Sequence, residues 1–355
     1  MRSNTIRKCE PALLRVGDLV EVRSAPEILA TLDERGELDN LPFMPEMLQF
    51  CGKRLTVHKV AHKLCDTISA SGNRWMNNAV HLTGSRCDGS AHGGCQTACS
   101  LYWKESWLRR IEDRLTPTIN PANLPAGGDK ITILDRATRK PMGQDGEEHF
   151  SCQATELLRA APCSIRFFNL RQYITDLKTG NVNIGEVLRS VLFHLFNIYQ
   201  DRSKRVLPSC LTLKEGLSWG FVKGCLEGST PTAALDLQPG ELVRIKTKEE
   251  IMQTLDLRRL NRGMGFEEEM ARSCGRTARV TRRVERCIDE KTGRLLTMKN
   301  PCIALEGVVC EGVYHANCPR EFIPFWREIW LERVEKNPNQ TAATAKDNSM
   351  SCDQS

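Results

Sequence analysis

The sequence contains no C-x2-C pair, although 16 of its 355 residues are cysteine. This absence removes the most diagnostic spacing of zinc ribbons and of thioredoxin-type redox motifs. No window of about 18 residues is apolar and uncharged, so no membrane-spanning helix is predicted. The sequence before Pro11 also lacks the apolar core of a signal peptide. We therefore expect a cytoplasmic protein whose cysteines are mostly reduced.

Motifs of the common enzyme classes are lacking as well. The "GGDK" at residues 127–130 lacks the surrounding pattern of a phosphate-binding or dinucleotide-binding loop. No cysteine or serine stands in a recognised nucleophile signature, and no pair of carboxylates stands out. The net charge of +6, from 50 basic and 44 acidic side chains, permits an acidic partner without requiring one. The sequence leaves enzymatic activity undecided.

What the sequence does contain is an internal duplication. "GDLVEVRSAPEILATLDERG" from Gly17 aligns with "GELVRIKTKEEIMQTLDLRR" from Gly240, at an offset of 223 (240 − 17). The offset holds without a gap to the end of both segments, which are residues 17–112 and 240–335. Identical residues recur in both segments: Gly52 and Gly275, Val57 and Val280, Gly84 and Gly307, Trp103 and Trp326, Trp107 and Trp330.

Each copy predicts the same order of elements. A short strand comes first, followed by a helix with a capping box, Ser24 with Glu27 or Thr247 with Glu250. Alternating apolar residues predict strands over 54–62 and 78–84, and an aromatic segment closes the copy. This order resembles small barrels of the Src-homology-3 type. We expect an α+β fold, with tandem duplicated small β-rich barrel-like domains flanking a helical middle segment.

The regions outside the two copies differ in composition. Residues 113–145 are rich in Pro, Gly, Asn and Asp, which is typical of a loop or linker. Residues 146–239 predict a helical middle segment with a linker, and the apolar periodicity of 184–200 indicates a packed helix. Residues 1–16 are interpreted as an N-terminal tail, and the polar residues 336–355 as a disordered tail.

Three stretches carry a resemblance that covers most of the chain. They are "LPFMPEMLQFCGKRLTVHKVAHKLCD" at 41–66, "RCDGSAHGGCQTAC" at 86–99 and "SCQATELLRAAP" at 151–162. On these stretches the chain resembles a bacterial family of cysteine-rich proteins of unassigned function. The resemblance implies no particular activity, and it assigns no catalytic residue.

The duplication also sorts the cysteines and histidines. Four pairs coincide under the offset: Cys51 and Cys274, Cys87 and Cys310, Cys95 and Cys318, His92 and His315. The spacing C-x4-H-x2-C, in "CDGSAHGGC" and "CEGVYHANC", is short enough to chelate one ion from a single loop. Three thiols and one imidazole form a common structural zinc shell. We therefore predict that each set of three cysteines and one histidine holds zinc.

The fourth ligand in the first copy depends on strand register. If residues 54–62 pair antiparallel with 78–84, paired positions sum to about 140, and Cys51 lies beside Cys87. The ligand atoms of Cys51, Cys87, His92 and Cys95 should then converge.

Cys99 has no counterpart, because Phe322 occupies the matching position. This unmatched cysteine leaves other interpretations of the cysteine pattern open. An iron–sulfur cluster could use Cys99 or Cys65 beside the loop cysteines. The thiols could instead be redox groups, form disulfides, or simply pack as small apolar side chains. Cys152 could add a thiol from the middle segment, although a lone helical cysteine usually belongs to a core.

We therefore predict a metal-binding interaction or scaffold protein with a Cys/His site in each repeat and a protein partner. The alternative is an iron–sulfur or thiol redox protein that acts through the first repeat. A weaker alternative is nucleic-acid binding by the basic second repeat, through Arg276, Arg279, Arg282, Arg283 and Arg286. No membrane partner is expected.

Overall fold

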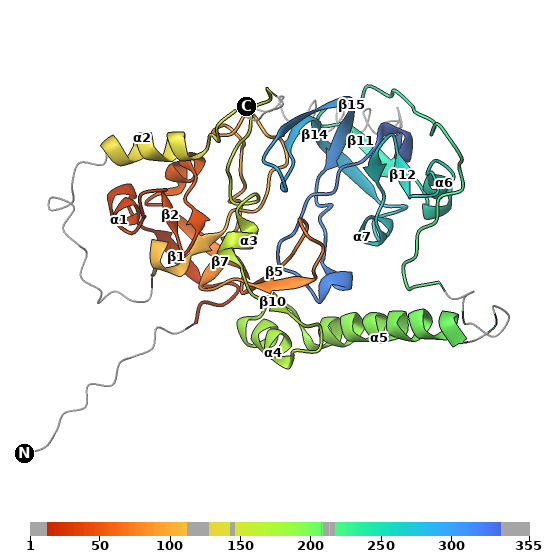
Figure 1. Ribbon diagram of the computed structural model, residues 1–355, viewed down its shortest axis with the longest axis horizontal. Coiled ribbons are helices and arrows are strands. Elements are labelled where there is room, and N and C mark those ends of the chain that lie inside the picture. Colours follow the sequence, from red (N-terminus) through yellow and green to blue (C-terminus); the bar gives the residue numbers. More distant parts are fainter. Residues whose placement is uncertain are drawn as a thin grey trace, which may run out of the picture. The chain divides into compact units, whose positions relative to one another are not determined.

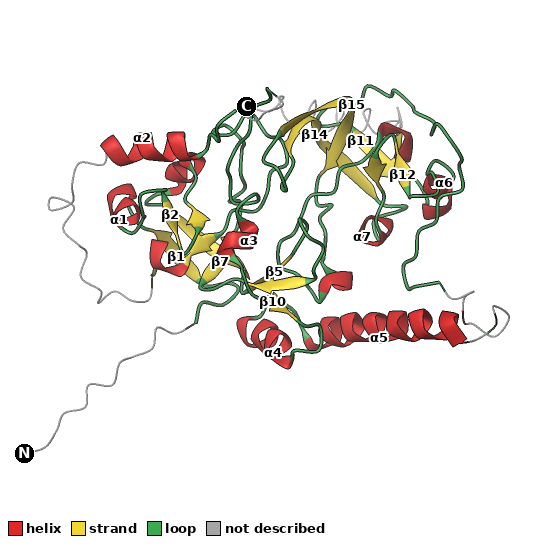
Figure 2. Cartoon of the chain, viewed as in Figure 1, coloured by secondary structure: helices red, strands yellow, loops and turns green. Residues whose placement is uncertain are grey.

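The computed structural model describes residues 13–111, 128–142, 146–206, 208, 213 and 217–334. It is α+β, as predicted, with short helices and antiparallel sheets (Figure 2). The predicted tail at 336–355 lies outside the described residues, as do 1–12 of the first tail and most of the linker at 113–145. None of the helices in the described part of the chain is long and apolar enough to cross a membrane.

The chain forms two compact units. The first contains the described residues up to Phe221, together with Val284–Asn300 and Val309–Ile323. The second contains Val222–Arg283, Pro301–Val308 and the described residues from Pro324 onward. The second repeated segment is therefore divided, and its cysteine-histidine loop belongs to the first unit.

The larger sheet of the first unit is antiparallel and has five strands (Figure 1). Its order is β8 (Trp103–Lys104), β7 (Ala79–Leu82), β4 (Arg54–Val60), β1 (Leu19–Val22) and β9 (Leu108–Arg110). A smaller sheet has the order β10 (Ser164–Ile165), β6 (Asn73–Trp75) and β5 (Lys63–Cys65). A short hairpin pairs β2 (Glu37–Leu38) with β3 (Leu41–Pro42).

The helices of the first unit are short except for one. They are α1 (Ala25–Ala30), η1 (Pro45–Phe50), η2 (Glu105–Trp107), α2 (Gly128–Ala137), α3 (Leu157–Ala160), α4 (Leu170–Thr179), α5 (Ile184–Val206) and η6 (Val313–His315). Helix α1 begins at the predicted capping box, where the Ser24 N–H donates to Glu27 at 3.0 Å.

Helix α5 corrects one prediction. Its leucines were expected to pack, but Leu188 and Leu192 are 57% and 62% exposed, whereas Ser190 and Gln200 are buried. The leucine stripe is therefore exposed, and the side of the helix that packs combines buried polar residues with Phe193, which stacks on Trp219.

The sheet of the second repeat has the order β15 (Leu295–Leu305), β14 (Thr277–Ile288), β11 (Leu242–Ile245) and β16 (Leu331–Arg333). The boundary between the two units cuts β14 and β15. The remaining elements are α6 (Lys248–Met252), the hairpin of β12 (Leu260–Asn261) and β13 (Met264–Gly265), α7 (Glu268–Ala271) and η7 (Glu328–Trp330).

Strand registers repeat under the offset of 223. Leu19 pairs with Thr56, and Leu242 pairs with Arg279. Val20 pairs with Arg110, and Val243 pairs with Arg333. The two segments therefore share their central strand pairings, while the closure of either sheet into a barrel stays a prediction.

The aromatic cores repeat as well. Phe43 packs edge-on against Trp107 with ring centroids 5.2 Å apart, and Phe266 packs against Trp330 at 5.3 Å. The four repeated tryptophans are fully buried. Their burial places them in the hydrophobic cores, so they do not line an exposed aromatic groove.

Candidate metal centre

The first loop, residues 87–99, folds tightly back on itself. The Cys87 N–H donates to the Cys99 carbonyl at 2.9 Å, which closes the base of the loop. Inside, the N–H groups of His92 and Gly94 donate to the Gly89 carbonyl at 3.1 and 3.0 Å. A Cβ atom on Gly89 would lie 1.9 Å from the Cys95 carbonyl oxygen, and its φ is +75°. Only glycine fits this position, because the backbone itself fills the space of a side chain.

The loop brings Cys87 and His92 together with Glu46 of η1. Cys87 Sγ lies 3.3 Å from His92 Nε2 and 3.2 Å from Glu46 Oε1, and His92 Nδ1 lies 3.5 Å from Glu46 Oε1. All three residues are buried, and one ligand atom from each lies within 4.8 Å of the others. Such a group could hold a metal ion.

Two polar atoms of this group have no hydrogen-bond partner among the described residues. They are Glu46 Oε2 and His92 Nδ1. Buried polar atoms are normally hydrogen-bonded, so each such exception needs a physical reason, such as an ion.

Sequence reasoning missed Glu46. It is the one charged residue in the apolar stretch "LPFMPEMLQFCG" at 41–52, and that isolation is the signal that could have found it. A carboxylate inside a segment that must pack is costly unless it has a partner.

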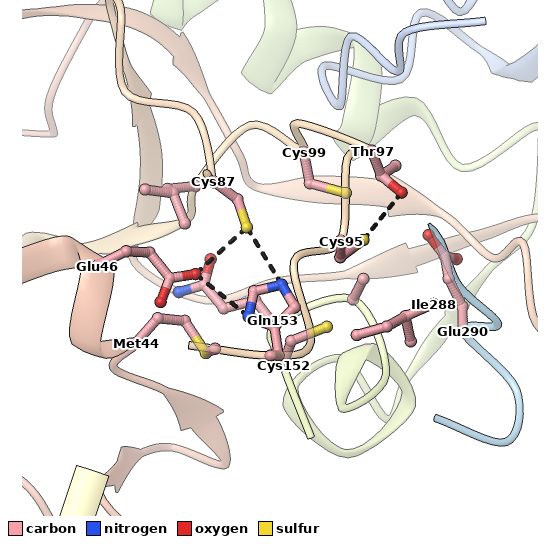
Figure 3. A pocket seen from close by; sticks show the side chains of 13 residues that line it. Met44, Glu46, Cys87, Cys95, Thr97, Cys99, Cys152, Gln153, Ile288 and Glu290 are labelled. Carbon is pink, nitrogen blue, oxygen red and sulfur yellow. Dashed lines mark hydrogen bonds and ion pairs between the residues drawn. The ribbon is translucent and has the colours of Figure 1, made fainter. Parts of the chain in front are cut away.

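The group lies at one side of a small buried cavity of about 30 Å³ (Figure 3). Four thiols line this cavity. Three belong to the first loop and the fourth, Cys152, precedes α3 in the middle segment. The other polar or partly polar lining residues are Glu46, His92, Thr97, Gln153 and Glu290.

Burial favours the neutral forms of three thiols, one carboxyl and one imidazole in this lining. It raises the pKa of Cys87 and Cys99 far above the usual range of a thiol, and raises that of Cys152 to about 12. Burial also raises the pKa of Glu46 and lowers that of His92 to about 4. No lysine or arginine is among the described residues that line the cavity. A cation would reverse these shifts, because metal ligands bind in their deprotonated forms.

Cys51 does not reach the cavity. The predicted register is correct, since Val60 pairs with Val80, but the Gly52 N–H donates to the Val22 carbonyl. The chain thus joins β1 directly after Cys51, and the Cys51 side chain packs against the hydrophobic core. Its counterpart Cys274 packs against the core of the second unit.

The second loop, residues 310–322, repeats the backbone of the first. The His315 and Asn317 N–H groups donate to the Gly312 carbonyl at 2.9 and 2.8 Å, and the Cys310 N–H donates to Phe322 at 2.7 Å. A Cβ on Gly312 would lie 2.6 Å from two backbone atoms of Cys318. The duplicated spacing therefore specifies a duplicated loop.

The side chains of the second loop have different neighbours. Cys318 Sγ accepts a hydrogen bond from the Cys65 N–H at 3.0 Å, and Cys274 lies in the other unit. Among the described residues, the group of three close ligand atoms is the one at Glu46, Cys87 and His92. The predicted second set, Cys274, Cys310, His315 and Cys318, is not assembled in this way.

The chain was compared with family models, with curated proteins and with solved structures, and no match was found in any of the three.

Proposed function

We propose that this chain is an iron–sulfur protein whose cluster occupies the cavity of the first unit. Its ligands are the thiolates of Cys87, Cys95, Cys99 and Cys152. The observation that carries the proposal is that four thiols from two separate segments face one buried cavity. Four cysteines are the usual ligand set of iron–sulfur clusters.

The spacing of the thiols supports a cluster over a single ion. A tetrahedral zinc ion with Zn–S bonds of about 2.3 Å places its sulfurs about 3.8 Å apart. No three of the four thiols lie mutually within 4.8 Å. Among the described residues, the ligand atoms that lie so close together are those of Glu46, Cys87 and His92. A polynuclear centre bridges the wider separation.

The size of the cavity is compatible with a covalently held group. A space of about 30 Å³ exceeds the roughly 10–15 Å³ that one buried water needs. Metal–sulfur bonds are much shorter than non-bonded contacts between atoms. A cluster bonded to the four sulfurs can therefore occupy space between them that a water molecule could not enter. The apolar lining, which includes Met44, Leu101 and Ile288, would shield it from solvent.

His92 and Glu46 then act on the cluster through Cys87. The imidazole lies within hydrogen-bond distance of the Cys87 sulfur. Hydrogen bonds to ligating sulfurs and the degree of burial set the reduction potential of iron–sulfur centres. A one-electron redox role follows from this arrangement.

A second candidate is a mononuclear zinc site at Glu46, Cys87 and His92. The observation that favours it is the convergence of these three ligand atoms at 3.2 to 3.5 Å. Such a site would be colourless and structural, as predicted from the sequence for zinc, but it has Glu46 instead of Cys51 and does not include Cys95.

The test is the metal content of the full chain purified without oxygen. We expect a brown protein with a broad visible absorbance band that contains iron and acid-labile sulfide. Cys152→Ser and Cys95→Ser should lose both, whereas the control Cys163→Ser, at an exposed cysteine, should retain them.

Two results would overturn the cluster. Colourless protein with one zinc per chain, lost in Glu46→Gln and His92→Ala but retained in Cys152→Ser, would establish the second candidate instead. Protein that binds neither metal, whose thiols react only after unfolding, would refute both.

We also propose, from the shared registers and loop geometry, that the two segments are copies of one barrel-like unit. Only the first loop retains a metal centre, because only it has Cys99 and faces Cys152.

A further inference from the structure

Two cysteines far apart in sequence meet at the second loop. Cys65 ends β5 and is partly exposed, and Cys318 is buried at 5% exposure. The Cys65 N–H donates to Cys318 Sγ at 3.0 Å, and the interaction with the Cys318 side chain raises the pKa of the Cys65 thiol. Both cysteines are free thiols.

The Cys318 sulfur has the surroundings of an anion. It accepts a hydrogen bond from the backbone N–H of Cys65 at 3.0 Å. The fully buried Lys63 ammonium is an electrostatic neighbour of the same sulfur. Burial alone would raise the pKa of Cys318, but the Cys65 thiol and the neighbouring backbone N–H groups lower it. Donor groups and a nearby cation stabilise a thiolate.

The contact between the thiols is held by its surroundings. The Asn73 amide donates to the His315 carbonyl at 2.9 Å, and Ser190 donates to Val313 at 2.7 Å. Lys63 Nζ donates to the Ala316 carbonyl at 2.5 Å. These bonds fix the second loop on the β5–β6 hairpin and on α5 without any covalent link, so the sulfurs are already in place to react.

We propose that Cys65 and Cys318 are a dithiol redox site that reduces small-molecule disulfides and is itself oxidised to the Cys65–Cys318 disulfide. A suitable acceptor is a glutathione-type disulfide. The site is separate from the cavity and does not depend on the proposed cluster.

An open cleft of about 460 Å³ lies beside this site. Its lining includes Asn73, which is the strand partner of Cys65, and Ala316 of the second loop. Cys65 is partly exposed whereas Cys318 is buried, so an acceptor would reach Cys65 first.

The exchange balances in two steps. The Cys65 sulfur attacks one sulfur of the acceptor and forms a mixed disulfide, while the departing acceptor sulfur takes the Cys65 proton and leaves as a thiol. The Cys318 thiolate then attacks the Cys65 sulfur, forms the Cys65–Cys318 bond and releases the second acceptor sulfur as a thiolate. Two protein sulfurs are oxidised, and one acceptor disulfide is reduced to two monothiols.

The test incubates the folded full chain with oxidised glutathione and counts free thiols. We expect a loss of two thiols per chain and a linked pair of peptides that contain Cys65 and Cys318. Cys318→Ser should accumulate glutathione on Cys65, whereas Cys65→Ser should gain none because Cys318 is buried. The controls Cys163→Ser and Cys225→Ser, at exposed cysteines, should form the linked pair as the wild type does.

Several results would overturn the proposal. They are an unchanged thiol count in the folded chain, a linked pair that involves other cysteines, or a link that forms only in urea. Cys65→Ala serves as a second variant, and thermal unfolding of each variant verifies folding. Iron content should equal that of the wild type in Cys65→Ser, and its loss would assign Cys65 to the metal centre instead.

Discussion

The first and second loops have the same backbone, but their thiols have opposite surroundings. In the first loop, Cys95 faces a cavity that three other thiols also line. In the second loop, the matching Cys318 faces Cys65, backbone N–H groups and the Lys63 ammonium. Burial raises the pKa of the first loop's Cys87 and Cys99, whereas hydrogen bonds lower that of Cys318.

This difference separates what a loop contributes from what its neighbours contribute. The spacing C-x4-H-x2-C fixes the fold around one glycine in each copy. The chemistry comes from residues outside the loop: Glu46 and Cys152 at the first, and Lys63 and Cys65 at the second. We infer that one duplicated loop supports a metal centre in one setting and a dithiol in the other.

The largest expected effect comes from adding one methyl group at the turn of each loop. In Gly89→Ala the new Cβ would meet the Cys95 carbonyl oxygen at 1.9 Å, so the first loop cannot close. We expect the iron content to fall at least about tenfold, in line with the cost of disturbing metal ligands. Metal analysis of anaerobically purified protein measures it.

Gly312→Ala is the matched variant in the second loop. It should retain the iron but lose the glutathione-dependent Cys65–Cys318 link, because its Cβ meets Cys318 backbone atoms at 2.6 Å. If both variants lost iron equally, the two loops would not act separately.

The second effect concerns the buried ion pair beneath the second loop. Lys63 and Asp176 are both fully buried and lie 2.5 Å apart. Lys63→Met leaves a carboxylate without its partner, which should cost about 3–5 kcal/mol of unfolding free energy. Urea unfolding monitored by tryptophan fluorescence measures the loss.

The double variant Lys63→Met/Asp176→Leu removes both charges and should recover part of that stability. A single variant that is no less stable than the double would show that the pair does not hold the second loop.

The third effect distinguishes the two units by pH. All seven histidines lie in the first unit, and burial lowers the pKa of His62 and His81 to about 4. The unfolded chain binds these protons near pH 6.5, so stability falls as the pH drops from about 6.5 to 4. The loss reaches about 3 kcal/mol per histidine.

Urea unfolding of the wild type and of His81→Leu across this pH range measures the effect. The difference between them isolates His81 from buried carboxyls such as Glu46, whose raised pKa acts with the opposite sign. Equal pH slopes for the two proteins would contradict the assignment.

Local features of this fold were predictable from sequence. The capping box at Ser24, the strand register near 140 and the repeated core tryptophans all depend on residues close in sequence or on the duplication itself. The position of Cys51 was not predictable in this way. Gly52, two residues before β4 begins, already hydrogen-bonds to β1, and this bond leaves the Cys51 side chain against the hydrophobic core.

The outer partners of each loop were not predictable in the same way. Cys152 lies outside both copies, and the second copy has no cysteine at the position that matches Cys65. Comparing the copies could therefore not select either residue. The placement of the second loop in the first unit depends on tertiary contacts such as Asn73 with His315. Duplication reveals what two copies share, whereas the chemistry here depends on what they do not share.

The smallest effect tests the comparison inside the two cores. The Trp103 Nε1–H donates to the buried Ser85 hydroxyl at 2.6 Å, whereas Trp326 Nε1 has no partner among the described residues, since Val308 matches Ser85. Trp103→Phe should therefore cost about 1 kcal/mol more than Trp326→Phe, because it also leaves the Ser85 hydroxyl unpaired. Hydrogen exchange at increasing urea, followed in peptides from each sheet, measures both losses of stability.

Trp107→Phe and Trp330→Phe are the controls. Both indoles donate to a threonine, at 3.1 and 2.8 Å, so the two control substitutions should cost the same unfolding free energy. Equal costs for Trp103→Phe and Trp326→Phe, with matched controls, would show that the serine adds nothing to the first core.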